Sequence, residues 1–318
     1  MKKITFVFFI TAVGLILTLG IRQNDPAGET SRQTEQSVAG DELMERPPAE
    51  QARAERVMKA LASAYPRQIE KVELRDGDWA VLLRDTWYYY AGGRLLPEEL
   101  LESAGDFNPS PFYNYSAEMP SWRSPTPEEA ERYRSMSNNR RQNSSRRSPH
   151  FFDDLWRARN RGESYERVKT LRFLGHTVTV HHLILESLSL IEEEILAASK
   201  EDPQIRSWVN NIKSLEGWAW RNIAETQSRS YHAYGLAVDI LPKSYGGKET
   251  YWLWASNKNV EWWNISYNNR YSPPDTVIKI FEKYGFVWGG KWLYFDTMHF
   301  EYRPEILILS GIPVETRR

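Results

Sequence analysis

The sequence of 318 residues contains no cysteine. Disulfide bonds, thiolate zinc ligands, a cysteine nucleophile and a lipidated cysteine anchor are therefore excluded, and histidine and carboxylate side chains remain as the plausible zinc ligands. The chain also lacks an excess of one charge, because 41 basic and 42 acidic side chains give a formal net charge of -1. Without a global positive field there is no electrostatic reason to bind nucleic acid, and we expect no nucleic-acid partner.

Three common catalytic motifs are missing as well. The sequence contains no Ser-x-x-Lys, no Gly-x-Ser-x-Gly and no His-Glu-x-x-His. Serine enzymes of the penicillin-binding type, hydrolases with a nucleophile elbow and zincin metallopeptidases therefore have no support in this chain. We also find no internal repeat and no glycine-rich phosphate loop.

The N-terminus combines two basic residues, Lys2 and Lys3, with an apolar run from Ile4 to Ile21. This order fits either a signal peptide that is removed or a membrane anchor that is retained, so residues 1–21 are assigned to one of these two. In both cases the bulk of the chain lies outside the cytoplasm. Residues 22–48 are polar and have no hydrophobic period, which is the composition of a disordered tether.

Residues 49–120 carry the pattern of a small α+β subdomain. Apolar positions recur at helical spacing up to Tyr65, and three short strand-like runs follow, the first two joined by the hairpin signal Asp76-Gly77. We expect a helix at 48–65 and strands at 72–74, 79–83 and 87–90. The aromatic run in the last strand is either part of the sheet or a contact for glycan or peptide.

Residues 121–165 are predicted to be a linker with short helices. Thr126-Pro-Glu-Glu129 forms a capping box with proline at the first helical position, so a short helix begins there. The stretch at 135–149 is rich in Ser, Asn and Arg, and is either a solvated linker or a contact for anionic lipid or wall polymer. One further helix is expected at 151–167.

Residues 166–318 hold the side chains with catalytic potential. His181 and His182 follow a predicted strand at 176–180, and because neighbouring strand residues point to opposite faces, we expect that they do not ligate one metal. Between Lys243 and Tyr271 lies an insertion rich in Trp and Tyr. We expect its aromatic rings partly to wall a cleft and partly to form a separate hydrophobic cluster. Scaffold elements are predicted as helices near 184–195, 203–213 and 275–284 and a strand at 286–288.

Two short polar patterns in this segment indicate one metal site. Residues 236–241 alternate as a half-buried strand with Asp239 on the polar face, and His232 precedes them in a turn that can fold back toward Asp239. Sixty residues later, strand alternation puts His299 and Glu301 on one face. The three residues His232, Asp239 and His299 would leave zinc one open position, as in catalytic sites. Unrelated polar residues at strand ends are the other interpretation of the same spacing.

The order of these residues resembles one peptidase family. Ser-x-His-x-x-Gly-x-Ala-x-Asp at 230–239, Gly-Gly-Lys-Trp at 289–292 and Asp-x-x-His-Phe-Glu at 296–301 are similar to the motifs of zinc D-alanyl-D-alanine carboxypeptidases and L-alanyl-D-glutamate peptidases. The resemblance covers roughly Leu171 to Leu309. It implies an α+β fold of the kind shared with hedgehog signalling domains, zinc as the cofactor, and peptidoglycan stem peptides as the substrate.

The resemblance also implies roles for single residues. His232, Asp239 and His299 are implied to be the zinc ligands, and Asp296 the general base. The residues expected to contact the substrate or to support the ligands are Ser230, Glu301 and Trp292.

An arginine is the candidate for recognising a carboxylate of the substrate. Relatives place an arginine at a similar distance before the Ser-x-His turn, which points to Arg221, although the residues around it differ from the usual ones. A guanidinium binds a carboxylate through two hydrogen bonds. A structural salt bridge is the other interpretation of Arg221, and Arg229 is the competing arginine.

These features together predict a zinc-dependent peptidase of the bacterial cell envelope, either a carboxypeptidase or an endopeptidase. We expect it to act outside the cytoplasm. Because of its N-terminal segment, we expect a membrane as a further partner. The alternative is a non-catalytic, zinc-containing binding module of hedgehog-like fold at the cell envelope. Asp296 argues against the alternative, because a module without catalysis needs no base. We also expect the residues before about Leu171 to be dispensable for chemistry on a small soluble peptide.

Overall fold

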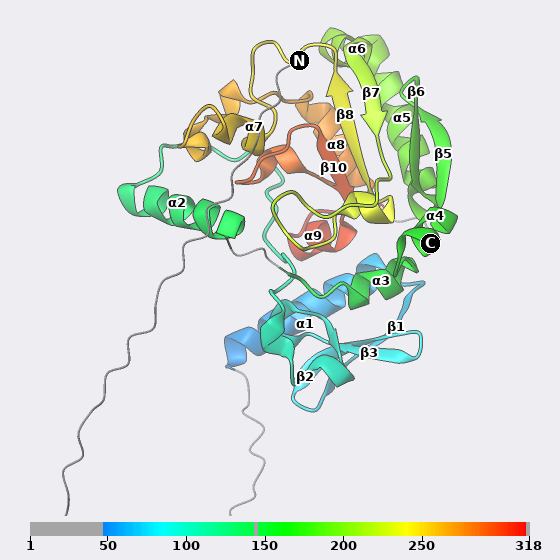
Figure 1. Cartoon of the computed structure of the whole chain (residues 1–318). Coiled ribbons are helices and arrows are strands. Elements are labelled where there is room, and N and C mark those ends of the chain that lie inside the picture. Colours follow the sequence, from blue (N-terminus) through cyan, green and yellow to red (C-terminus); the bar gives the residue numbers. More distant parts are fainter. Residues whose placement is uncertain (1–46, 143–145, 316–318) are drawn as a thin grey trace, which may run out of the picture. The chain divides into compact units, whose positions relative to one another are not determined.

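The computed structural model describes residues 47–142 and 146–315, which belong to one compact unit (Figure 1). The signal peptide or anchor predicted at 1–21 and nearly all of the tether predicted at 22–48 lie outside the described residues. Among the residues that are described, no helix is both long and apolar enough to cross a membrane.

Helices and strands are mixed along the chain, which confirms the predicted α+β class. The nine α-helices of the described residues are α1 (Pro48–Ala64), α2 (Pro127–Gln142), α3 (His150–Trp156), α4 (Arg161–Arg167), α5 (Leu185–Glu201), α6 (Pro203–Asn210), α7 (Trp252–Ser256), α8 (Asp275–Lys283) and α9 (Pro304–Leu309). The ten strands of the same part of the chain are β1 (Ile69–Arg75), β2 (Asp78–Leu83), β3 (Thr86–Tyr89), β4 (Leu96–Pro97), β5 (Val168–Phe173), β6 (His176–His181), β7 (Ile212–Glu216), β8 (Ala237–Pro242), β9 (Phe286–Trp288) and β10 (His299–Tyr302).

The strands form three antiparallel sheets. The first contains β1 to β4 in sequence order, and the second is the β5-β6 hairpin. The third has the order β7-β8-β10-β9, so that β8 and β10, which are sixty residues apart in the chain, are hydrogen-bonded neighbours. This neighbour relation joins the two halves of the predicted metal site.

The N-terminal elements form as their sequence patterns predict. Helix α1 buries Val57, Met58 and Leu61 on one face and ends just before Pro66, which cannot continue a helix. The β1-β2 hairpin turns at Asp76 and Gly77, whose φ angles of 47° and 79° are left-handed, as a tight hairpin turn requires. Strand β4 is an addition that the sequence did not indicate, because its two residues are too short to show a period.

The middle of the chain contains more regular structure than we expected. The capping box at the start of α2 is present, since the Thr126 and Glu129 side chains each accept the other's backbone N–H. The helix does not end early but continues to Gln142, because its Glu, Arg, Met and Gln residues are good helix formers despite their polarity. The single helix expected at 151–167 is two helices, since α3 ends at Arg157 in a left-handed conformation.

One hydrophobic core runs from α1 to α9. It contains Leu61 from α1, Phe151 from α3, Val238 from β8 and Ile306 from α9, all essentially inaccessible to solvent. Helix α1 packs on β1 and β2 on one side and on α9 on the other (Figure 1). The domain boundaries predicted near 120 and 166 stay a prediction, and the core has members on both sides of them.

The aromatic insertion forms a second, smaller core, as predicted for part of its residues. Trp252, Trp262 and Trp263 pack with Phe295 in a cluster separate from the main core. Trp254 is 48% exposed and does not belong to it. The cluster therefore fixes the insertion against the segment that leads into β10.

Tyr65 connects α1 to the C-terminal elements by a buried hydrogen bond. Its hydroxyl donates to Oε2 of Glu305 in α9 at 2.5 Å. Removing the hydroxyl in Tyr65→Phe leaves a buried carboxylate oxygen without this donor, so we expect the free energy of unfolding to fall by about 1–3 kcal/mol. Urea denaturation measures this loss.

Tyr165→Phe is the matched control, because Tyr165 is 65% exposed and no hydrogen bond to its hydroxyl is found among the described residues. Its free energy of unfolding should stay that of the wild type. Equal stability of the two variants would mean that the Tyr65 hydrogen bond does not hold α1 in place.

Candidate metal centre

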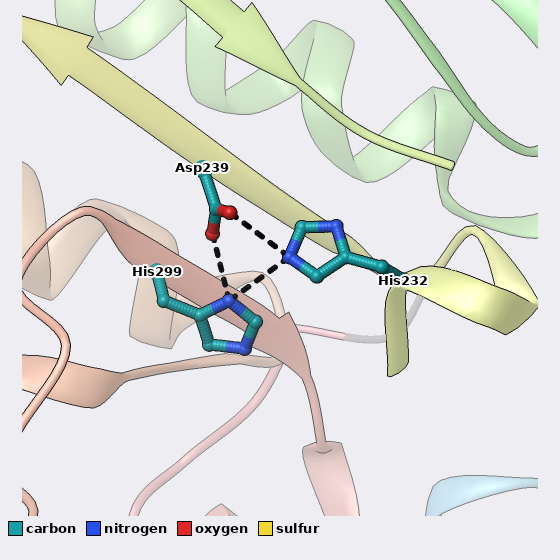
Figure 2. Close-up of side chains that lie close together, drawn as sticks. All are labelled: His232, Asp239 and His299. Atoms are coloured by element: carbon teal, nitrogen blue, oxygen red, sulfur yellow. Dashed lines mark hydrogen bonds and ion pairs between the residues drawn. The ribbon is translucent and has the colours of Figure 1, made fainter. Parts of the chain in front are cut away.

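Three side chains with metal-ligand atoms converge on one point. Nε2 of His232 lies 3.1 Å from Oδ2 of Asp239 and 3.2 Å from Nδ1 of His299, and that Nδ1 lies 2.8 Å from Oδ1 of Asp239 (Figure 2). These residues are the only group of three or more His and carboxylate ligands found among the described residues that could hold a metal ion. The sequence prediction brought together the same three residues.

Strand register places two of these side chains. In the β8-β10 pair, His299 is directly opposite Asp239, so both side chains project from the same face of the sheet. His232 comes from a short 3-10 helix, Tyr231–Tyr234, that directly precedes β8. The Ser230 hydroxyl caps this helix by accepting the backbone N–H of His232 at 3.3 Å. Ser230 therefore orients the turn, as expected.

Gly235 lets the chain turn from the short helix into β8. Its φ of 72° is left-handed, and a Cβ there would lie 2.7 Å from the backbone nitrogen of His181. Only glycine meets both conditions without displacing the neighbouring strand β6. The glycine in the predicted motif thus has a steric role in directing His232 toward β8.

In each imidazole, the ring nitrogen that points away from the other two ligand residues has a hydrogen-bond partner that orients the ring. Nδ1 of His232 donates to the backbone carbonyl of Gly217 at 2.6 Å, and Nε2 of His299 donates to Oε2 of Glu301 at 3.1 Å. In metal sites such partners fix the tautomer and leave the inner nitrogen free to bind the ion. Glu301 is therefore placed to support His299, which is one of the two roles expected for it.

The spacing of the three ligand atoms suits zinc. Ligands about 2.0–2.1 Å from a tetrahedral zinc are about 3.3 Å from one another. The observed separations of 2.8 to 3.2 Å are close to that value. Two imidazoles and a carboxylate are also a donor set found in catalytic zinc sites, so the residues present fit the ion that the sequence predicts.

The pKa values of His299 and Asp239 are both shifted by the charges around them. Burial alone lowers the pKa of His299, but hydrogen bonds to the Asp239 and Glu301 carboxylates outweigh it and raise this pKa to about 10. Burial alone raises the pKa of Asp239, yet the two neighbouring imidazoles hold it well below its usual range.

Asp296 lies in the turn that leads into β10, three residues before His299. Its Oδ1 accepts the backbone N–H of Met298 at 3.3 Å, and its own N–H donates to the carbonyl of Gly289 at 3.1 Å. Burial and the nearby Asp239 carboxylate raise the pKa of Asp296 to about 7. A carboxyl group with a pKa near neutrality can both accept and release a proton during a reaction.

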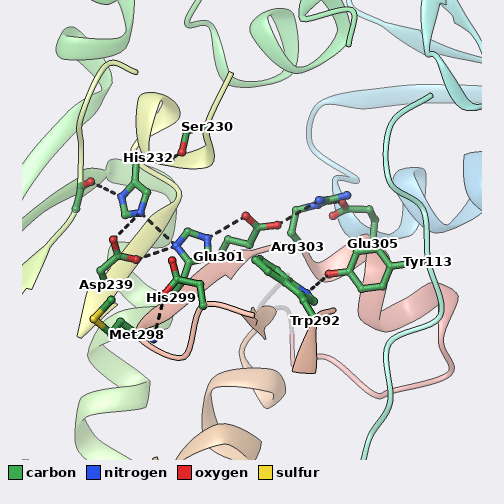
Figure 3. A network of polar contacts seen from close by, with 12 residues as sticks. Tyr113, Ser230, His232, Asp239, Trp292, Met298, His299, Glu301, Arg303 and Glu305 are labelled. Carbon is green, nitrogen blue, oxygen red and sulfur yellow. Dashed lines mark hydrogen bonds and ion pairs between the residues drawn. The ribbon is translucent and has the colours of Figure 1, made fainter. Parts of the chain in front are cut away.

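A chain of buried charges leads away from the centre (Figure 3). Glu301 also accepts from Nη1 of Arg303 at 3.3 Å, and the Arg303 guanidinium forms an ion pair with Glu305. Arg303 is only 1% exposed, and its buried charge is compensated by carboxylates on either side of it. Glu305 is the residue that accepts the Tyr65 hydroxyl.

Trp292 packs against the centre rather than facing away from it. Its ring centroid lies 5.6 Å from that of His299, and its Nε1 donates to the Tyr113 hydroxyl at 2.8 Å (Figure 3). Tyr113 and Tyr65 both precede Leu171, so the part of the chain that we expected to be dispensable contacts the surroundings of the centre. These contacts argue against that expectation.

The two candidate arginines differ in their contacts. Arg229 forms an ion pair with Asp153 and lies over the Trp220 ring, 4.5 Å from its centroid. The Arg221 side chain is exposed, and within the described residues no hydrogen bond or ion pair of it is found. Its backbone carbonyl accepts the N–H of Ser230 at 3.2 Å, which places it next to the capped turn.

Sequence reasoning missed several residues of the site. Arg303 follows Glu301 by two and so lies on the same face of the chain, a signal that strand alternation could have supplied. The Gly217 carbonyl and the Tyr113 hydroxyl carried no such signal, because a backbone acceptor and a remote tyrosine have no motif of their own. Only the tertiary structure brings them to the ligands.

Two parts of the chain match known families. Residues 224–302 match a family model described as D-alanyl-D-alanine carboxypeptidase, and residues 57–112 match one described as a domain of unknown function. No curated protein and no solved structure matches the chain. The first match includes all three converging ligand residues and Asp296, in the order predicted from the sequence. In its sequence match and in the arrangement of its ligand residues, the C-terminal part of the chain is therefore similar to D-alanyl-D-alanine carboxypeptidases.

Proposed function

We propose that the protein is a zinc-dependent peptidase that cleaves stem peptides of bacterial peptidoglycan, as a carboxypeptidase or as an endopeptidase. The observation that carries this proposal is the convergence of His232, Asp239 and His299, with each imidazole oriented from outside. The family match at residues 224–302 supports the reaction class. The apolar run after Lys2 and Lys3 supports action outside the cytoplasm, in the cell envelope.

In this proposal the three converging side chains hold the zinc ion. When bound, zinc supplies a Lewis acid that polarises the scissile carbonyl and lowers the pKa of water. The Gly217 carbonyl and Glu301 keep both imidazoles in the ligating tautomer. Burial raises the pKa of Glu301, but the hydrogen bond and charge of His299, with a further contribution from the buried Arg303, outweigh it and lower this pKa.

Asp296 is the proposed general base. Its carboxylate takes a proton from the attacking water and delivers it to the departing amine as the peptide bond breaks. Its place in the turn before β10, held by the Met298 N–H, keeps the carboxylate next to the centre without making it one of the three converging ligands. Arg221 is proposed to bind a substrate carboxylate, since its guanidinium is exposed beside the capped turn.

We expect the purified protein to bind about one zinc ion per chain. His232→Ala and His299→Ala should lose the metal, whereas the control His182→Ala should keep it, because His182 is exposed and outside the ligand group. Elemental analysis after dialysis measures this. Zinc retained by both His232→Ala and His299→Ala would refute the ligand assignment.

Zinc binding should also release protons and weaken as the pH falls. The reason is that His299, whose pKa is about 10 without metal, must lose its Nδ1 proton to become a ligand. Calorimetric titrations in buffers of different ionisation enthalpy measure the number of protons released. Glu301→Gln should weaken zinc affinity by roughly 10- to 100-fold, since a carboxylate supports the ligand more strongly than an amide.

Asp296→Asn should keep its zinc and its fold but lose roughly 10²- to 10⁴-fold in turnover, the usual contribution of a positioned acid or base. The assay digests purified peptidoglycan fragments and identifies the products by mass. Release of terminal D-alanine indicates a carboxypeptidase, and internal cleavage an endopeptidase. No product from the zinc-loaded wild type would favour the non-catalytic module instead.

Arg221→Lys should lower kcat/KM on these fragments about tenfold or more, because a point charge replaces a guanidinium that can form two hydrogen bonds. Arg229→Lys is the matched comparison. It should lower stability rather than catalysis, since Arg229 pairs with Asp153. Unchanged turnover in Arg221→Lys and lost turnover in a stable Arg229→Lys would exchange the two roles.

A further inference from the structure

A second site lies among α3, α4 and the β2-β3 turn, lined by residues that are not part of the metal centre. It is a cavity of about 320 Å³. Its lining combines Arg67 and Arg84 from the N-terminal elements with Arg157, Arg167 and the pair His181 and His182 from the later ones. A cavity of this volume is in the range of small-molecule sites.

The charges that line this cavity do not balance. Four guanidinium groups face one carboxylate, that of Glu70. The carboxylate of the nearby Asp154 is engaged elsewhere, since it accepts the Tyr88 hydroxyl at 2.6 Å and pairs with Arg159 at 2.7 Å. Burial and the like charges of Arg157 and Arg159 lower the pKa of Arg84, although the Asp154 carboxylate acts in the opposite direction. Within the described residues, the Arg84 guanidinium donates to the backbone carbonyl of Asp154.

Two guanidinium groups of the lining are available to a ligand. Arg67 and Arg157 are exposed, and within the described residues neither has a hydrogen bond or an ion pair. Nε of Arg167 and Nε1 of Trp156 also lack a hydrogen-bond partner among these residues, but both atoms are buried. The exposed guanidinium groups are therefore the ones that an anion in the cavity can reach.

His181 is held as a neutral side chain of the cavity wall. His181 donates from Nε2 to the Trp156 carbonyl at 3.3 Å and accepts at Nδ1 from the Leu183 N–H at 3.2 Å. Burial, with His182 and Arg167 nearby, lowers the pKa of His181 to about 4. His181 is therefore a neutral wall of the cavity, with the exposed His182 stacked on it at a centroid distance of 4.6 Å.

We propose that this cavity binds the phosphate group of a small phosphorylated ligand or of a phospholipid headgroup. Several guanidinium groups around one cavity match the three or more acceptor oxygens of a phosphate, and each can bind two of them. A carboxylate has only two oxygens and would leave more donors unpaired. The site is distinct from the metal centre and does not depend on the proposed peptidase function.

The probe for the test is inorganic phosphate, titrated by calorimetry into the full-length, zinc-loaded protein. The double variant Arg67→Gln/Arg157→Gln should bind it at least tenfold more weakly than the wild type, since both side chains are exposed and can change without disturbing the core. Arg167→Gln should weaken binding as well. Arg172→Gln is the matched control, an exposed arginine on β5 that does not line the cavity.

Three comparisons decide the result. Acetate at equal concentration should compete poorly. Phosphate binding that survives Arg67→Gln/Arg157→Gln but is lost in His299→Ala would place the phosphate at the metal centre and overturn the proposal. The absence of any phosphate binding would also overturn it. Glycerol 3-phosphate then represents a small phosphorylated ligand, and phosphatidylglycerol vesicles represent a phospholipid headgroup. The ligand class of the site is the one whose binding depends on Arg67 and Arg157 and not on Arg172.

Discussion

The pairing of β8 with β10 is the constraint on which the rest of the structure depends. It sets Asp239 opposite His299 and so brings a carboxylate and an imidazole from distant parts of the chain into contact. A shift of the register by one residue would turn either side chain to the other face of the sheet. The main core secures the register, because Val238 and Phe300 are paired in the same two strands and fully buried. The buried hydrophobic side chains on one face of the sheet therefore fix the positions of Asp239 and His299 on the other face.

Charge compensation extends this constraint beyond the ligands. Glu301 orients His299, Arg303 compensates Glu301, and Glu305 compensates Arg303. Each of these groups is buried, and each would be costly without the next. The series ends at Tyr65, the residue that caps the C-terminus of α1. The N-terminal elements thus have a physical connection to the metal centre, which explains why one core includes both α1 and α9.

The molecule handles buried charge in two opposite ways. At the metal centre each imidazole has a hydrogen-bond partner on the nitrogen that points away from the other ligands. In the cavity between α3 and α4, four arginines share one carboxylate, and Arg67 and Arg157 have no partner among the described residues. Only the second arrangement leaves an electrostatic demand that the described residues do not meet, and an anionic ligand would meet it.

The sequence by itself determined the α+β class and the helix and hairpin at 48–83, because strand alternation and turn residues are local signals. It pointed to His232, Asp239 and His299 as one site through the resemblance of their motifs to a peptidase family. It did not determine the length of α2, where helix propensity without an amphipathic pattern prevailed over linker-like composition. Only the tertiary structure decided that the Gly217 carbonyl orients His232, that Arg229 is taken by Asp153 while Arg221 is not, and that Tyr65 reaches Glu305. The physical reason is the same in each case: contacts between residues far apart in the chain follow from packing, and packing leaves no period in the sequence.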